Sequence, residues 1–376
     1  MAGIYFHFPF CRQACNYCNF HFSTQLKYQD KMLQAYEKEI GMRNKEWPEN
    51  LESIYFGGGS PSLLSPKSVD HLINVLSKKI NLSQGVEITI EVNPDDVSFE
   101  YLEALSSIGI NRLSIGIQSF FDRELKLMNR IHNADQGIKT IEWTAKLFQN
   151  FSVDLIYGIP LSDLFSWKKN LNQALSFDVP HLSSYALTVE PRTVLSNQVK
   201  NNKLQLLDEE WVRAQYDWMV NRMEEASYEN YEFSNFSKPG FHAVNNANYW
   251  KGKAYMGIGP AAHSYDGKRK RSWNLSNNVK YLKSIEEGIL PTRYENLNIN
   301  ESFNEYLMTG LRTSWGVSLQ KIMETFGKHY SNYLEKQVEN HLIDQRLYWD
   351  GDALKVSKNA KFLTDGIASD LFLLKN

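Results

Sequence analysis

The stretch HFPFCRQACNYCNF, from His7 to Phe20, contains every cysteine of the 376-residue chain. Cys11, Cys15 and Cys18 have the spacing C-x3-C-x2-C and directly follow a short apolar run. An odd number of thiols this close together does not suit a disulfide framework and fits a reducing compartment. We therefore interpret the stretch as a metal-binding loop at the end of a β-strand.

The loop allows three chemical interpretations. A [4Fe–4S] cluster normally takes four thiolates, so three would leave one iron open to bind and activate a small molecule. Zinc is the main alternative, because the three cysteines and His21 form a possible Cys3His set. Structural zinc sites, however, usually take paired ligands from two separated segments. Buried thiols without a metal are the third interpretation. The spacing favours the cluster and leaves the other two open.

The first 190 residues alternate apolar strand-like runs with stretches of helical periodicity. Strands are predicted at 4–8, 53–59, 87–92, 112–118, 153–160 and 181–189. Helices are predicted at 25–45, 66–80, 99–108, 134–149 and 164–177. Six successive β-then-α units favour a parallel sheet, either in a barrel or in an open doubly wound fold. The cysteines follow the first strand, and α/β barrels carry their chemistry at that end of their strands.

The remaining residues read as an extension and a smaller domain. Helical periodicity is lost around 227–276, and KRKR at 268–271, the only basic run, is expected to be a solvated turn. Helices are predicted at 277–287, 300–311, 318–326 and 329–343, followed by a hairpin turning at 350–352 and a last helix from about Asn359. This order resembles a winged-helix module, interpreted as a packing domain because it lacks a dense basic face. The predicted division is 1–235, 236–298 and 299–376.

The composition is that of a globular protein, with 42% hydrophobic and 22% charged residues. A formal net charge of −2 gives no general attraction to nucleic acid or anionic lipid. No apolar run is long enough to span a bilayer, and the N-terminus does not read as a signal peptide. We expect a cytoplasmic protein with no nucleic-acid partner and at most peripheral membrane contact.

Further motifs follow the cysteine loop at successive predicted strand ends: GGGSPS at 57–62, EVNP at 91–94, GIQSF at 116–120, LMNRIH at 127–132 and DLIYGIP at 154–160. In this order they resemble the radical S-adenosylmethionine (SAM) superfamily, specifically the haem-chaperone group of its coproporphyrinogen-oxidase-related branch. The resemblance covers nearly the whole chain. It implies a partial (β/α)6 TIM-type barrel with a smaller C-terminal α+β domain. It also implies a [4Fe–4S] cluster on Cys11, Cys15 and Cys18, with SAM exchangeable at the open iron.

The resemblance also implies a set of SAM-binding residues: Tyr5, Gly58, Gly59, Ser60, Glu91, Gln118, Arg130, Asp154 and Ala186. Ser60 stands where the family more often has Thr, and the hydroxyl is kept. The cationic fork of Arg130 suits a carboxylate. The implied chemistry is reductive cleavage of SAM to methionine and a 5′-deoxyadenosyl radical, with an electron donor as partner.

Two features distinguish members of the branch. The decarboxylating coproporphyrinogen dehydrogenase has a further cysteine where this chain has Phe20, and an N-terminal extension, whereas this chain begins four residues before Tyr5. We therefore expect a haem chaperone that binds haem and delivers it to haem-accepting proteins. An oxygen-independent coproporphyrinogen III oxidase is the alternative, and a zinc-stabilised binding module is the third candidate.

The segment FHAVNNANYW at 241–250 concerns haem. The chaperone group typically has H-N-x-x-Y-W here, and Asn245 stands where that histidine would be. An amide is a poor ligand for haem iron, so His242 and His263 become alternative ligands. Tyr249 and Trp250 are suited to pack on a porphyrin.

Overall fold

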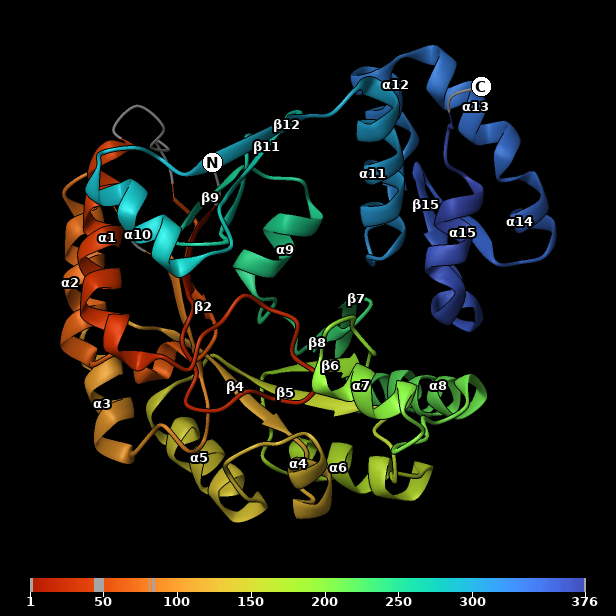
Figure 1. Ribbon diagram of the computed structural model, residues 1–376. Helices are drawn as coiled ribbons and strands as arrows, with labels where there is room; N and C mark the ends of the chain where they lie inside the picture. The colour runs from red at the N-terminus through yellow and green to blue at the C-terminus, as the bar shows by residue number, and fades with distance from the viewer. Residues whose placement is uncertain (1–2, 44–50, 81, 83–84, 375–376) are drawn as a thin grey trace.

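The computed structural model describes residues 3–43, 51–80, 82 and 85–374 (Figure 1). Six parallel strands stand in chain order at the centre of the main sheet. They are β1 (Gly3–Phe8), β2 (Ser53–Gly58), β3 (Glu87–Val92), β4 (Arg112–Gln118), β5 (Phe151–Tyr157) and β6 (His181–Ala186). All six overlap predicted strands. The second, fifth and sixth end earlier than predicted. In the second and fifth the chain turns at Gly58 and Gly158, whose φ angles are positive.

Helices connect the strands, and most of them lie on the convex side of this sheet (Figure 1). They are α1 (Gln29–Met42), α2 (Pro66–Ser77), α3 (Phe99–Ser107), α4 (Asp122–Leu127), α5 (Ala134–Leu147), α6 (Leu164–Ser176), α7 (Val194–Lys200) and α8 (Glu209–Glu225). The sequence analysis did not predict α4, α7 or α8. The helix predicted at 25–45 starts late because a 3-10 turn (Leu26–Tyr28) precedes α1, and its residues 44 and 45 lie outside the described residues.

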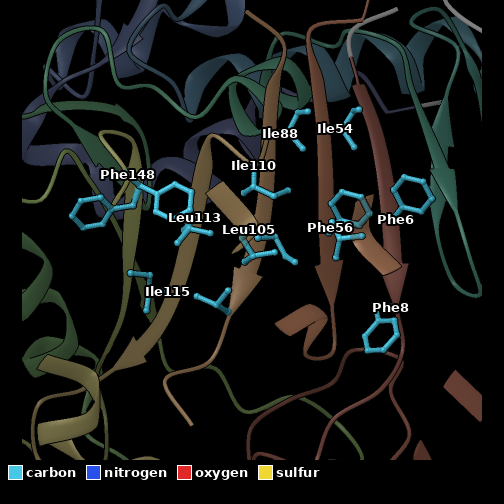
Figure 2. Close-up of a cluster of buried hydrophobic side chains, with 14 of the residues drawn as sticks. Phe6, Phe8, Ile54, Phe56, Ile88, Leu105, Ile110, Leu113, Ile115 and Phe148 are labelled. Atoms are coloured by element: carbon cyan, nitrogen blue, oxygen red, sulfur yellow. The ribbon is translucent and has the colours of Figure 1, made fainter. Parts of the chain in front are cut away.

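Side chains alternate between the two faces of the central strands. Phe6, Phe8, Ile54, Phe56 and Ile115 belong to the core between the sheet and the helices (Figure 2). Their neighbours in sequence project to the opposite, concave face, as the two-residue period of a strand requires. The concave face carries polar side chains. The alternation therefore separates the residues that stabilise the fold from those available for chemistry.

Further strands extend the sheet at both edges. At the β1 edge lie β9 (Tyr255–Ile258), β10 (His263–Tyr265), β11 (Lys270–Asn274) and β12 (Thr292–Asn296), and at the β6 edge lie β8 (Asn235–Ser237) and β7 (Glu229–Glu232). Only β9 among these runs parallel to its central neighbour. Within the described residues, the twelve-stranded order ends at β12 and β7, which do not pair, so the barrel is open.

The structure adds detail to two sequence expectations for this region. The stretch 227–276, where helical periodicity is lost, contains short strands and the short helix α9 (Val244–Trp250), which contacts β2, and none of these was predicted. Only the first half of the KRKR run lies in a turn, in which Asp266 Oδ1 accepts the backbone N–H groups of residues 268, 269 and 270. The second half belongs to β11, which begins at Lys270. Strands of three to five residues are too short to show a clear alternation.

A buried carboxylate joins the extension to the barrel. Glu39 on α1 is fully buried, and its Oε1 accepts from Arg43 Nη2 at 2.8 Å and Asn274 Nδ2 at 2.8 Å. Its Oε2 accepts from the Gly259 backbone N–H at 2.9 Å and from the Tyr281 hydroxyl at 2.6 Å. Tyr281 lies on α10 (Asn278–Glu286). One side chain thus ties together α1, α10, β11 and the loop after β9.

The C-terminal residues form a second, smaller unit with its own core, which includes Phe303, Leu307, Ile322, Leu334 and Leu354. Its elements are α11 (Ile299–Leu311), β13 (Val317–Ser318), α12 (Leu319–Phe326), α13 (Lys328–Gln337), α14 (Glu339–Ile343), β14 (Leu347–Asp350), β15 (Ala353–Val356) and α15 (Thr364–Asp370). The predicted hairpin is β14–β15, and β13 completes a three-stranded sheet. The last helix begins later than predicted, after a 3-10 segment (Lys358–Leu363).

In the part of the chain described by the structure, no helix has both the length and the apolar character needed to cross a membrane.

Candidate functional site

A cavity of about 560 Å³ lies at the carboxyl ends of the parallel strands, a size that suits a small-molecule or cofactor site. The cavity is lined by every residue that the sequence analysis assigned to a cluster or to SAM: Tyr5, Cys11, Cys15, Cys18, Gly58, Gly59, Ser60, Glu91, Gln118, Arg130, Asp154 and Ala186. Tyr5, Glu91 and Asp154 are concave-face positions of β1, β3 and β5. The alternation along the strands therefore brings together residues up to 181 positions apart.

The cysteine loop is held in place by backbone groups. The Cys11 N–H donates to Ser23 O at 3.1 Å, and the Asn16 N–H donates to Met128 O at 3.1 Å. The Asn129 side-chain amide donates to Ala14 O at 2.7 Å. None of these bonds uses a thiol, and all three cysteine side chains remain partly exposed in the cavity. The fold thus presents three free thiols on a fixed loop.

The electrostatics of the loop suit thiols that bind a metal group. Burial raises the pKa of Cys11 to about 12 and also raises the pKa of Cys18, so that neither ionises readily without a positive charge nearby. Bound metal supplies such a charge and deprotonates a coordinating thiol. Arg130 Nη1, at 3.6 Å from Cys15 Sγ, is a further cation beside the loop. These donors fit a [4Fe–4S] cluster.

His21 is not placed to complete a Cys3His zinc site. Its Nε2 lies 2.6 Å from Asn278 Oδ1, and it does not line the cavity. Across residues 3–43, 51–80, 82 and 85–374, no three His, Cys, Asp or Glu side chains are grouped to hold one metal ion. The geometry therefore gives no support to the mononuclear alternative.

The glycine run is joined to the cysteine loop along the backbone. The Gly59 N–H donates to Phe8 O and the Ser60 N–H to Phe10 O, both at 2.7 Å. A Cβ on Gly59 would lie 2.5 Å from Phe10 O, which is far too close for any side chain. Glycine is thus required at position 59 because two backbones touch there.

Replacing Gly59 by alanine is expected to force the two loops apart. Overpacking of this kind costs about 1–3 kcal/mol, and it also breaks the two backbone hydrogen bonds. We expect a lower unfolding midpoint and a lower iron content after anaerobic reconstitution. Gly41→Ala is the matched control, because a Cβ at this helical glycine meets nothing within 4 Å. Equal iron content and equal midpoints in both variants would contradict the expectation.

A string of polar contacts leads from the glycine run to the cysteine loop. Asn93 Nδ2 donates to Ser60 Oγ at 2.8 Å, and Arg130 Nη2 donates to Asn93 Oδ1 at 2.5 Å and to Gly116 O at 2.9 Å. The Arg130 Nε–H is buried and has no acceptor. A buried donor without an acceptor is costly, so this N–H fits a carboxylate ligand such as the methionine end of SAM.

Two buried carboxyl groups lie on the concave face. Glu91 accepts from the Tyr55 hydroxyl at 2.9 Å and from the Gly58 N–H at 3.1 Å, and Asp154 accepts from the Ser114 and Ser152 hydroxyls at 2.8 Å each. Burial raises the pKa of Glu91 to about 7 and raises the pKa of Asp154, while the donors to each group oppose the shift. Both carboxyl groups line the cavity, where their oxygens can accept hydrogen bonds from ligand hydroxyls.

In the cavity wall, Tyr5 is fixed by a hydrogen bond to His7, and Gln118 has a positive φ angle. The Tyr5 hydroxyl lies 3.2 Å from His7 Nδ1, and His7 Nε2 lies 2.8 Å from His21 O. Because a carbonyl only accepts, Nε2 carries the proton of a neutral ring, and Tyr5 donates to Nδ1. Burial lowers the pKa of His7 to about 4, which agrees with a neutral ring. Gln118 has a φ of 64° at an irregularity in the β4–β5 pairing, which redirects its side chain.

The structure does not bring the haem candidates together. Asn245 and Tyr249 line the cavity, but His242, Trp250 and His263 do not. Asn245 is buried and accepts from the Ser53 hydroxyl at 2.9 Å. His242 stacks on Tyr231 and pairs with Glu229 at 2.8 Å. The Arg312 guanidinium lies over Trp250, and His263 is exposed and stacks on Trp273.

The sequence analysis missed several polar residues of the cavity: Tyr55, Asn93, Arg112, Ser114, His181 and Ser183. Asn93 lies two residues after Glu91, directly beyond the end of β3. Extending the two-residue period of β4 back from Gln118 would have found Ser114 and Arg112. The other three lie out of step with the residues assigned on β2 and β6, so the period does not lead to them.

The comparisons agree with this geometry. The radical SAM superfamily profile matches residues 5–164. "Heme chaperone HemW" of Bacillus subtilis (strain 168) is 34% identical over 87% of this chain and 88% of its own length. "Radical S-adenosyl methionine domain-containing protein 1, mitochondrial" of Danio rerio is 30% identical over 99% and 87%.

Among solved structures, the radical SAM enzyme coproporphyrinogen III oxidase (HemN) of Escherichia coli superposes with a TM-score of 0.85 at 20% identity, covering 99% of this chain and 90% of that chain. This confirms the predicted α/β fold with its additional C-terminal part. The relatives confirm the resemblance that the motifs indicated. The chain belongs to the radical SAM superfamily and, within it, to the family of the heme chaperone HemW.

Proposed function

We propose that this protein binds haem and delivers it to haem-accepting proteins in the cytoplasm, using a cavity that holds a [4Fe–4S] cluster and SAM. Membership of the superfamily implies the cluster and SAM. The observation that carries the proposal is the convergence of all twelve assigned residues on one cavity. Its haem part is supported by curated relatives named heme chaperone that match most of the chain.

In this proposal the residues of the chain have separate tasks. Cys11, Cys15 and Cys18 hold the cluster, and Arg130 pairs with the carboxylate of SAM. Glu91 and Asp154 accept hydrogen bonds from its hydroxyl groups. The cluster, when bound and reduced, supplies the electron for reductive cleavage of SAM. The buried walls of the cavity limit access of water to the bound ligands.

The deciding experiment is a turnover assay with an anaerobically reconstituted protein. Reductant, SAM and coproporphyrinogen III are added, and porphyrins are measured after oxidation. We expect an unchanged porphyrin pool while the cluster stays intact. Formation of protoporphyrin would instead identify a decarboxylating oxidase and overturn the chaperone proposal.

Haem titration of the same protein tests the other half of the proposal. We expect a saturable Soret band and transfer of the haem to an apo-haemoprotein. His242→Ala and His263→Ala test the ligand, since Asn245 is buried and already hydrogen-bonded. Replacing the histidine that binds the haem iron should shift the Soret band, and replacing the other histidine should leave the band unchanged. Absence of saturable binding by the unmodified protein would contradict the proposed function.

A further inference from the structure

A series of hydrogen bonds runs from Asp154 in the cavity to the edge of the sheet. The Ser152 hydroxyl donates to Asp154 Oδ1 at 2.8 Å, and Ser152 Oγ lies 3.2 Å from His181 Nδ1. His181 Nε2 lies 2.8 Å from the Tyr231 hydroxyl. The Asn246 side-chain amide donates to the same Tyr231 oxygen at 3.2 Å. The series crosses β5, β6, β7 and α9, which are distant in sequence.

The chemistry of the groups fixes the direction of every bond in this series. Ionised Asp154 only accepts, so the single hydroxyl proton of Ser152 points to it. Ser152 Oγ must then accept from His181, which places the ring proton on Nδ1. Burial holds the pKa of His181 well below its ordinary value, so the ring is neutral and Nε2 is an acceptor. The Tyr231 proton therefore points to Nε2, and Asn246 donates to the oxygen of Tyr231.

The members of the series have little freedom to rearrange. Ser152 and Tyr231 are fully buried, and His181 is 1% exposed. Tyr231 stands at the irregularity in the β7–β8 pairing, and its carbonyl accepts from the Ser314 N–H of the C-terminal unit at 3.0 Å. Hydrogen bonds that all point the same way strengthen one another in a low dielectric. The series thus acts as one polarised unit whose positive end faces the carboxylate.

Other groups near Asp154 also act on its ionisation. Arg112 on β4 favours the charged form, while Glu91 on β3 repels it. Tyr55 on β2 and Tyr185 on β6 are neutral phenols facing the same carboxylate. The hydroxyls of Ser114 and Ser152 donate to Asp154 and favour its charged form. Ser183, whose Oγ lies 3.0 Å from Ser152 Oγ, also favours the charged form. Burial opposes all of these donors.

We infer that Tyr231, acting through His181 and Ser152, is a positioning residue that keeps Asp154 oriented and ionised for its ligand. Without the Tyr231 hydroxyl, His181 Nε2 loses its donor. The Nδ1–H then donates less strongly to Ser152 Oγ, and the Ser152 hydroxyl in turn donates less strongly to Asp154. The carboxylate loses part of this stabilisation, and its pKa rises further. This inference rests on the proposed SAM site, because Asp154 is assigned there.

The test measures SAM affinity against pH on the reconstituted protein by calorimetry. Affinity falls as the pH drops through the pKa of Asp154, since the carboxylate is the accepting form. In Tyr231→Phe we expect this fall to begin up to about one pH unit higher, with binding up to about tenfold weaker below the pKa of Asp154 and little changed well above it. Ser152→Ala, which removes the hydrogen bond to Asp154, should shift the profile in the same direction by at least as much. The double variant should show no further loss, because both residues serve one series.

Tyr228→Phe is the matched control. Its hydroxyl is also buried and donates to Val179 O, but it is not part of the series. We expect it to keep the unmodified pH profile, which separates the series from a general effect of removing a buried hydroxyl. If the unmodified protein binds SAM and both Tyr231→Phe and Ser152→Ala keep its profile, the inference fails and the proposed function stands. If the unmodified protein binds no SAM, both fail together.

Discussion

Alanine at Cys11, Cys15 and Cys18 together is expected to reduce iron and acid-labile sulfide to background and to leave a colourless protein that still folds. The cluster depends on these thiols, and no other cysteine exists in the chain. The loop itself is held by backbone and amide contacts to Ser23, Met128 and Asn129, which the substitutions leave intact. The unfolding free energy of the apo form should therefore change by less than about 1 kcal/mol.

His21→Ala serves as the control for this variant, because His21 was the fourth member of the alternative zinc set. Its ring pairs with Asn278 and lies away from the cavity. We expect full iron and sulfide content in this variant. If the triple variant retained its iron, the ligands would lie elsewhere. If the unmodified protein carried one zinc and no iron after anaerobic preparation, the cluster itself would be refuted.

Replacing Glu39 by alanine is expected to lower the free energy of unfolding by about 3–5 kcal/mol, the usual cost of breaking a buried ion pair by removing one member. Arg43 is 3% exposed and would lose its ion pair with Glu39. The Tyr281 hydroxyl and the Gly259 N–H would also lose their acceptor. Urea denaturation of the apo protein, followed by tryptophan fluorescence, measures the loss.

Glu37→Ala is the control for the Glu39 variant, because Glu37 lies on the same helix and pairs with His71 at the surface. Both partners are about half exposed, so the pair contributes less than about 1 kcal/mol. Equal destabilisation by the two substitutions would show that the buried network does not hold the extension to the barrel.

The central part of the fold could be predicted from the sequence because the six parallel strands are long and apolar. Each predicted strand overlaps an observed one, and β2 and β5 end earlier than predicted where a glycine with positive φ turns the chain. Strands β7 to β12 were not predicted, since runs such as β8 and β10 have three residues each. Their pairing depends on β1 and β6, which are remote in sequence.

The candidate site could be predicted from the sequence only through its motifs. Cys11, Gly59 and Arg130 stand in recognisable sequence patterns, and all line the cavity. Ser152, His181 and Tyr231 have no pattern, because their role arises from contacts between strands distant in the chain. The haem candidates were chosen from one local segment, and a helix of seven residues necessarily spreads such a segment over several faces.

The alternation of side chains along the central strands has a consequence for how this architecture diversifies. A substitution at Tyr5, Glu91 or Asp154 changes what the cavity can bind and removes little of the packing beneath it, because Phe6, Ile90 and Val153 face the other way. Selection can therefore act on the chemistry of the cavity and on the stability of the fold at two separate sets of positions. Lineages can then exchange one chemistry for another on an unchanged scaffold, which agrees with a fold shared at 20% identity.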